Sequence, residues 1–262
     1  MGLRFFFIIF LMGSVLQSNA QAFTTQIIST NPLTAEKFIG VDDYGNTYHQ
    51  TKNVLYKLEK EKRYQFSDIQ LGKLASVDII NPLRITLFYR DMNTVVVLDN
   101  RLNEITRVNF NNLPNFRMVL FATTAKNNSF WIFNSDLQQV ELFDYQNQKV
   151  ISHSQPFNEI VYDLKTNFNF AWVQLEHTIE MYNVYGSFIQ EFSISKTTSF
   201  QVSDQKMITK NEEGFKLSKA MHGNFFNLSI SENDVKEFHF NNENLYIYNG
   251  KDVKHYQINL AK

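Results

Sequence analysis

The 262-residue sequence predicts an all-β fold, and three observations carry this prediction. Aromatic residues make up 15% of the chain, with 25 Phe and 12 Tyr, and such side chains suit pleated, half-buried strands. Short apolar runs alternate with polar turns, and the pattern returns about every 40 residues. A chain of this length can bury a sizeable core as one domain.

The repeat consists of an apolar hairpin followed by a third apolar strand. The clearest copies occupy residues 84–110, 129–152 and 170–192, and weaker copies occupy 46–66, 206–230 and 245–258. The second hairpin strand of each copy ends near Leu58, Asp99, Asp144, Asn183, Ser218 and Ile258. The intervals are about 41, 45, 39, 35 and 40 residues, which is the range of a propeller blade.

One more apolar stretch precedes each hairpin, at residues 37–41, 75–80, 118–123, 160–164, 200–202 and 235–240. This stretch brings each repeat to four strands, the number in a propeller blade. We therefore predict a single six-bladed β-propeller over residues 23–262. Five or seven blades follow if the least regular copy, near residues 197–230, is divided differently.

The last copy has only three strands before the chain ends. The stretch at residues 25–28 is apolar in part and has no blade of its own. We predict that this N-terminal strand pairs with the C-terminal blade, because such pairing closes the ring and removes exposed strand edges.

Residues 1–22 have the pattern of a secretory signal peptide. Arg4 supplies the positive charge, residues 5–12 are an unbroken apolar run, and small residues allow cleavage after Ala20 or Ala22. The apolar segment is shorter than the roughly twenty residues that span a bilayer, although an uncleaved anchor stays an alternative. We expect an exported protein, periplasmic or associated with the outer membrane, whose mature chain has no transmembrane segment.

Composition excludes several classes of function. The chain has no cysteine, which rules out disulfides, thiolate metal sites and a lipid anchor on an N-terminal cysteine. The formal net charge is −1 and no basic stripe is present, so nucleic-acid binding is not expected.

No pattern in the sequence predicts a cofactor, a metal site or a catalytic group. The six histidines are far apart and form no metal-binding spacing. The run from Asp42 to Asn46 could offer oxygens to calcium, but a β-turn with Gly45 at positive φ is favoured. Asp78, Asp91 and Asp163 are candidate glycosidase carboxylates, yet nothing in their spacing singles out a pair.

Trp131 and Trp172 occupy equivalent second strands of neighbouring repeats. Packing between blades is favoured for both over a sugar-binding platform. The candidate binding residues are Asn81, Arg84, Tyr89 and Arg90, which flank strand ends where propeller faces bind partners, although a role in the turn is favoured for each.

The blades carry no WD dipeptide, kelch double glycine or Asp-box. The segments at residues 81–89 and 95–100 resemble a stretch of uncharacterised exported β-propeller proteins of Gram-negative Bacteroidota. The resemblance implies an envelope location and a role as an accessory subunit of an outer-membrane or secretion assembly.

Two functions follow from these observations. The first is a non-catalytic interaction scaffold that presents one propeller face to another envelope protein. The alternative is a glycan-binding protein or hydrolase with a site at the mouth of the propeller channel. A broad apolar patch on one face favours the first, and inward-facing charged groups with shifted pKa values favour the second.

Overall fold

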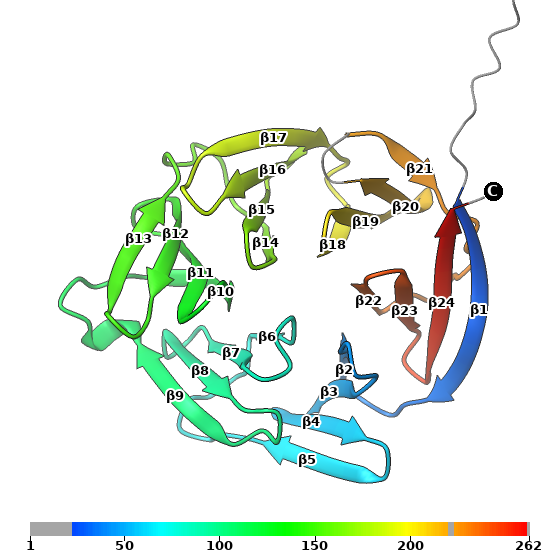
Figure 1. Cartoon of the computed structure of the whole chain (residues 1–262), viewed down its shortest axis with the longest axis horizontal. Helices are drawn as coiled ribbons and strands as arrows, with labels where there is room; N and C mark the ends of the chain where they lie inside the picture. The colour runs from blue at the N-terminus through cyan, green and yellow to red at the C-terminus, as the bar shows by residue number, and fades with distance from the viewer. Residues whose placement is uncertain (1–22, 220–222, 261–262) are drawn as a thin grey trace, which may run out of the picture.

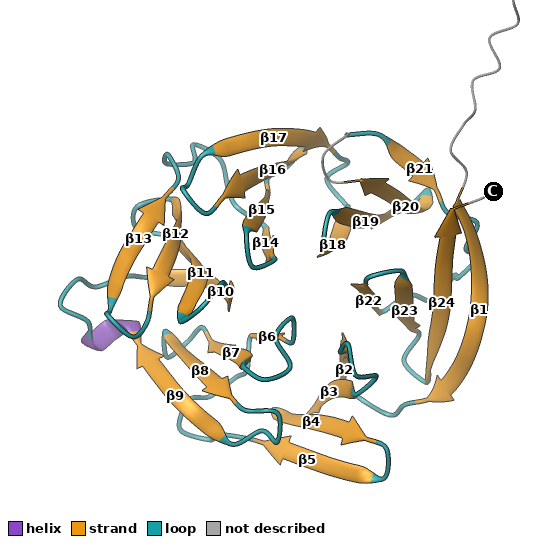
Figure 2. Ribbon diagram, in the orientation of Figure 1, coloured by secondary structure: helices purple, strands orange, loops and turns teal. Residues whose placement is uncertain are grey.

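The computed structural model describes residues 23–219 and 223–260, so the predicted signal peptide at residues 1–22 lies outside the described residues. Six four-stranded antiparallel sheets form a ring around a central channel (Figure 1), which confirms the predicted six-bladed β-propeller. Among the described residues the only helical element is a short 3-10 helix, η1 (Phe110–Asn112) (Figure 2). In the same part of the chain no helix could cross a membrane.

Each blade follows the predicted order of four strands. Blade 1 contains β2 (Lys37–Val41), β3 (Thr47–Thr51), β4 (Val54–Glu59) and β5 (Lys62–Phe66). Blade 2 contains β6 (Ser76–Asp78), β7 (Ile85–Tyr89), β8 (Thr94–Leu98) and β9 (Glu104–Asn109). Blade 3 contains β10 (Val119–Thr124), β11 (Ser129–Asn134), β12 (Gln139–Asp144) and β13 (Lys149–His153).

Blades 4 to 6 also have four strands each, including blade 5, which corresponds to the least regular repeat. Blade 4 contains β14 (Asp163–Thr166), β15 (Phe170–Gln174), β16 (Thr178–Asn183) and β17 (Phe188–Ser193). Blade 5 contains β18 (Ser199–Ser203), β19 (Lys206–Asn211), β20 (Gly214–Lys219) and β21 (Phe225–Asn227). Blade 6 contains β22 (Glu237–Asn241), β23 (Asn244–Tyr248), β24 (Asp252–Leu260) and, as its outer strand, β1 (Phe23–Pro32).

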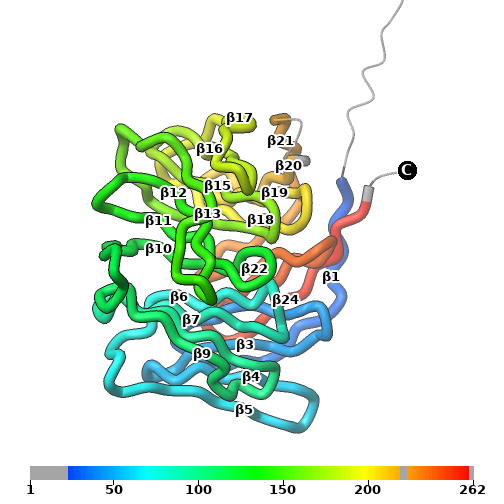
Figure 3. The backbone as a smooth tube through the Cα atoms, turned by 60° about the vertical axis from the view of Figure 1, so that its left-hand side comes forward, coloured from blue at the N-terminus to red at the C-terminus, as the bar shows by residue number. Residues whose placement is uncertain are grey.

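The two ends of the chain close the ring, as predicted. β1 pairs with β24 in antiparallel register from Phe23 opposite Leu260 to Pro32 opposite Asp252, and the two strands lie side by side in both views (Figures 1 and 3). Pro32 ends the strand, where its missing N–H breaks no ladder bond. The predicted N-terminal segment therefore supplies the fourth strand of blade 6.

The core lies between neighbouring blades. Trp131 and Phe133 of blade 3 pack in one buried cluster with Val173 and Tyr182 of blade 4. Trp172 of blade 4 packs with Phe200 and Met207 around blade 5. Both tryptophans are fully buried, so the prediction that they pack between blades is confirmed.

Short polar side chains form the turns that separate the strands. The carboxylate of Asp99 accepts the N–H of Arg101, at 2.8 Å, and that of Asp144 accepts the N–H of Gln146, at 2.9 Å. Asn183 makes the same bond to Tyr185, at 2.9 Å, at the equivalent turn of blade 4. Such side-chain bonds to the backbone two residues further on favour turns over strands, which explains the regular punctuation of the sequence.

The first strand of every blade lies beside the channel (Figure 1). The turns after five of these strands line one cavity, so all of them end on the same side of the ring, which we call the mouth face. Because neighbouring strands are antiparallel, the turns between second and third strands lie on the other side. We call that side, with the connections between blades, the opposite face.

Candidate functional site

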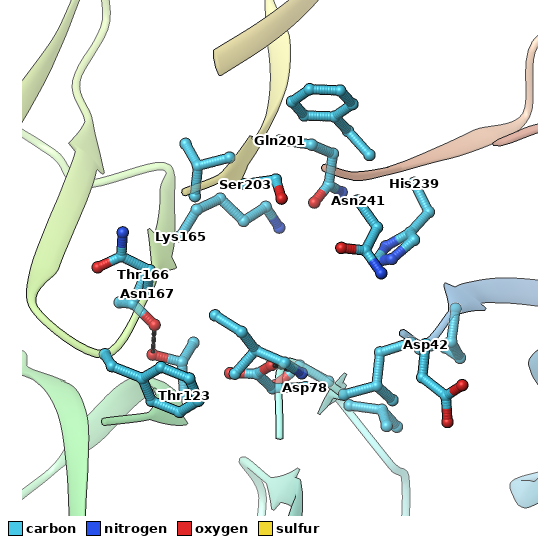
Figure 4. Close-up of a pocket in the computed structure, with 18 of the residues that line it drawn as sticks. Asp42, Asp78, Thr123, Lys165, Thr166, Asn167, Gln201, Ser203, His239 and Asn241 are labelled. Atoms are coloured by element: carbon cyan, nitrogen blue, oxygen red, sulfur yellow. Dashed lines mark hydrogen bonds between the residues drawn. The ribbon is translucent and has the colours of Figure 1, made fainter. Parts of the chain in front are cut away.

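A cavity of about 330 Å³ occupies the channel at the mouth face, and all six inner strands or the turns after them line it. This volume is in the range of small-molecule sites. Lys165, Gln201, Asn241 and His239 come from three neighbouring blades and point toward one another across the opening (Figure 4). The channel mouth is therefore a polar, concave site of the kind that the sequence left open as an alternative.

Carboxylates outnumber cations around this cavity. Its described lining includes Asp42, Asp43, Asp78, Asp163 and Asp204, against Lys165 as the one lysine or arginine. The Nζ of Lys165 lies 3.0 Å from the carboxylate of Asp163. An anionic ligand would therefore meet like charges on several sides of the cavity.

Asp78 is held by hydrogen bonds from its own blade and from the next one. Its carboxylate accepts the N–H of Ile80, at 2.9 Å, and that of Thr124 in the next blade, at 2.7 Å. Burial raises the pKa of the Asp78 carboxyl, and the hydrogen bonds from Ile80 and Thr124 only partly offset the effect. Asp78 thus presents a hydrogen-bonding oxygen to the cavity and ties blade 2 to blade 3.

His239 lies flat against Gly40 of the neighbouring blade. A Cβ atom on Gly40 would lie 2.5 Å from Cγ of the imidazole, so only glycine allows this approach. Burial lowers the pKa of His239 to about 4, and the charge of Lys165 acts in the same direction. The imidazole is therefore neutral at pH 7.

Lys37 starts the inner strand of blade 1. Burial lowers the pKa of its ammonium, and the nearby charge of Lys165 lowers it further. Glu237 of blade 6 opposes this effect and also accepts the N–H of Phe38, at 3.1 Å. The channel therefore contains inward-facing charged groups with shifted pKa values.

Hydrogen bonds between blades fix the rim of the mouth. The hydroxyls of Thr123 and Thr166 lie 2.8 Å apart (Figure 4). Further links include Asn167 Nδ2 to the Asp204 carbonyl at 3.0 Å, Asn242 N–H to Ser203 Oγ at 2.7 Å, and Asn241 Nδ2 to Asp43 Oδ1 at 2.8 Å. These bonds hold the lining side chains in place before any ligand arrives.

Asp42 has a structural role at this rim. Its buried carboxylate accepts the N–H groups of Tyr44 and Asn46, the amide of Asn46 and the hydroxyl of Tyr48, all within 3.0 Å. Gly45 has a φ of 80°, so the predicted β-turn is confirmed. In the described part of the chain no group of three or more His, Asp or Glu side chains could hold a metal ion.

The opposite face carries exposed apolar side chains over blades 2 to 4. They are Met92, Phe116, Met118, Leu137, Ile160 and Tyr162, which we call the apolar patch. Hydrogen bonds join the turns that carry them: Asn93 Nδ2 donates to the Arg117 carbonyl at 2.6 Å, Ser135 N–H to the Met118 carbonyl at 2.8 Å, and Phe157 N–H to the Gln138 carbonyl at 2.7 Å. The turns that carry the patch are therefore linked across two boundaries between blades.

The four predicted binding residues are divided between the two faces. Asn81 and Arg84 lie in the turn before β7, on the mouth face, and Arg84 Nη1 contacts the Asn127 carbonyl of blade 3 at 3.4 Å. Arg90 follows β7 on the opposite face, where its Nε donates to the Leu120 carbonyl at 3.1 Å. Tyr89 is fully buried between blades 1 and 2. The structure does not bring these four side chains together, and none of them lines the cavity.

Of the other candidates, the structure brings two carboxylates to one site. Asp78 and Asp163 both line the cavity, whereas Asp91 is exposed on the opposite face. His239 is the one described histidine at the cavity, and His222 lies outside the described residues. No sequence pattern singled out His239, Lys165, Gln201 and Asn241 as site residues. The only signal that the sequence holds for them is their position on an inner strand of a repeat.

Three solved structures are similar to the chain over most of its length. The WD40 domain of Pan2 from Neurospora crassa matches with a TM-score of 0.59 and 11% identity, covering 85% of this chain and 74% of that one. A catalytically inactive virginiamycin B lyase from Staphylococcus aureus, with quinupristin, matches with a TM-score of 0.55 and 12% identity, covering 90% and 99%. A streptogramin B lyase matches with a TM-score of 0.57 and 10% identity, covering 90% and 98%.

No family model matches the chain, and no curated protein matches it significantly. At such low identities, similarity to solved structures shows the fold alone. The class of protein is thus a β-propeller, and the activities of its structural neighbours do not transfer with the fold.

Proposed function

We propose that this protein is a non-catalytic interaction scaffold of the cell envelope, and that the apolar patch binds another envelope protein. The observation that carries the proposal is the presence of six exposed apolar side chains on linked turns of one face. Large exposed apolar areas on soluble proteins mark interaction sites. Phe, Tyr and Met, which supply four of the six side chains, are enriched in the centres of protein interfaces.

The rigid ring supports this role. The turns that carry the patch are fixed by bonds between blades, so a partner would order few groups on binding. The resemblance of residues 81–100 to exported propellers supports an envelope location, and an accessory subunit of an outer-membrane or secretion assembly is the form of scaffold that we propose.

Two leucines allow a matched test, because Leu137 in the patch and Leu83 on the mouth face are each 56% exposed. Crosslinking and affinity recovery from native envelopes would compare the wild type with Leu137→Asp and Leu83→Asp. We expect one stoichiometric partner with the wild type and Leu83→Asp, and about tenfold less with Leu137→Asp. Recovery of no stoichiometric partner, or equal recovery with both variants, would overturn the proposed function.

The proposed location has its own measurement. Cell fractionation followed by N-terminal sequencing should find the mature chain in the envelope, beginning at Gln21 or Phe23. A chain that stays in the cytoplasm and begins at Met1 would contradict export.

A further inference from the structure

We propose that the cavity at the channel mouth binds the end of a glycan without acidic groups, a mono- or disaccharide unit. This site lies on the other side of the ring from the apolar patch, so the inference does not depend on the proposed function.

The cavity has donors and acceptors that the protein itself leaves unused. The Gln201 amide makes no hydrogen bond to another described residue, and Asn241 uses its Nδ2 but not its Oδ1. Ser203 Oγ accepts from Asn242, so its own proton remains available to a ligand. Such a mixture suits sugar hydroxyls, each of which donates and accepts.

Apolar walls accompany these polar groups. Phe168 lines the cavity from the turn after β14, where 37% of the residue remains exposed, and Ile39, Val77 and Val202 line it from other inner strands. The C–H face of a sugar ring can pack on an aromatic ring while the hydroxyls at its edge reach polar side chains. The lining thus offers both kinds of contact that a sugar ring needs.

Charge limits the class of sugar. The lining carboxylates disfavour phosphorylated sugars and uronic acids, since each would place a further anion beside Asp78 or Asp163. Lys165, which extends into the opening (Figure 4), is already paired with Asp163, at 3.0 Å. The described lining therefore disfavours acidic sugars.

The test is a titration of the purified mature chain with neutral, acidic and amino sugars. Isothermal titration calorimetry and chemical-shift changes in the protein's NMR spectrum measure the binding. The probes are glucose, galactose, mannose, N-acetylglucosamine and their disaccharides, with glucuronic acid and glucosamine as the charged counterparts. We expect saturable binding of at least one neutral probe, and about tenfold weaker binding of glucuronic acid, whereas glucosamine should bind at least as well as glucose. No saturable binding by any neutral probe, or binding of glucuronic acid that is as tight as that of glucose, would overturn the proposal.

Variants locate the site and separate it from the scaffold function. Gln201→Ala and Phe168→Ala should each weaken binding of the neutral sugar about tenfold, and Leu137→Asp should leave it unchanged. Phe168 is partly exposed, so its variant keeps the test valid if Gln201→Ala fails to fold. Unchanged affinity in a folded Phe168→Ala or Gln201→Ala would place the sugar elsewhere and overturn the site. Partner recovery with Phe168→Ala should stay at the wild-type level, which distinguishes failure of this inference from failure of the scaffold proposal.

Discussion

Two boundaries between blades are built in different ways. Blades 3 and 4 meet through a large apolar cluster that contains Trp131, Phe133 and Tyr182. Blades 6 and 1 meet through a smaller cluster and through polar bonds, among them Tyr248 hydroxyl to the Ala35 carbonyl at 2.8 Å and the contact of His239 with Gly40. The first boundary depends on burial, whereas the second also depends on charge and on close fit.

The difference shows where the ring is sensitive to its surroundings. Burial of apolar surface hardly varies with pH, so the boundary between blades 3 and 4 should behave alike in acid and at neutrality. The boundary between blades 6 and 1 contains a histidine that must stay neutral. Two predictions test the boundary between blades 6 and 1, and a third compares the two apolar boundaries on either side of blade 4.

The largest expected effect is the acid sensitivity of the boundary between blades 6 and 1. The pKa of His239 falls from 6.5 to about 4 on folding, so between these pH values the unfolded chain binds a proton that the folded chain does not. The free energy of unfolding should therefore decrease as pH falls from 6.5 to 4, by up to about 3 kcal/mol from this group. Lys165 strengthens the effect, and Asp42 and Asp43 oppose it.

Denaturant unfolding at several pH values measures this effect. His239→Gln removes the titration, so its stability should fall less than that of the wild type over the same range. The carboxylates titrate in both proteins, so their contribution cancels when the two free energies of unfolding are subtracted. Equal slopes for the two proteins would show that His239 does not couple this boundary to pH.

A second prediction concerns the close fit at the same boundary. Gly40→Ala would place a methyl group 2.5 Å from Cγ of His239, so the imidazole must move, at a cost of about 2 kcal/mol. Gly45→Ala is the control, because nothing lies within 4 Å of its Cβ and only its positive φ opposes the change, at about 1 kcal/mol.

A double variant separates packing from other causes. If the imidazole is what the added methyl group meets, combining Gly40→Ala with His239→Ala should cost less than the sum of the two single changes. Thermal or denaturant unfolding measures the four proteins. Strict additivity would mean that the two residues do not share this contact.

Much of this architecture could be predicted from sequence, because local physics fixes it. Apolar runs of strand length and Asx turns recur within each repeat, and a missing fourth strand predicts its source at residues 25–28. The Trp131 and Trp172 positions follow from the same repeat. The strands, turns and tryptophan positions are signals contained within about 45 residues of chain, whereas the closing strand follows from counting strands over all six repeats.

The cavity could not be predicted in this way. Its lining takes one or more side chains from each blade's inner strand or the turn after it, so Lys165, Gln201 and His239 become neighbours only after the ring closes. The candidate binding residues failed to converge for a related reason. Arg84 and Arg90 are close in sequence, but the five-residue strand β7 between them spans roughly 17 Å and puts them on opposite faces.

The smallest predicted effect compares the two tryptophans. Trp131 Nε1 donates to the Asn167 carbonyl at 3.2 Å, whereas the buried Nε1 of Trp172 has no partner among the described residues. In the corresponding turn of blade 5, the Asp204 carbonyl already accepts the Asn167 amide. The two tryptophans thus match in position and burial but differ in one hydrogen bond.

Trp131→Phe removes the same volume from the boundary between blades 3 and 4 as Trp172→Phe removes from the boundary between blades 4 and 5, so the cavity cost should be similar. Trp131→Phe also leaves the Asn167 carbonyl without its donor, and Trp172→Phe instead removes an N–H that is buried without a partner among the described residues. We expect Trp131→Phe to destabilise the protein by about 1 kcal/mol more than Trp172→Phe, measured by denaturant unfolding at pH 7. If Trp172→Phe were the costlier change, the apolar boundaries would differ in packing rather than in polar satisfaction. The contrast with the boundary between blades 6 and 1 would then have to be drawn from close fit and charge alone.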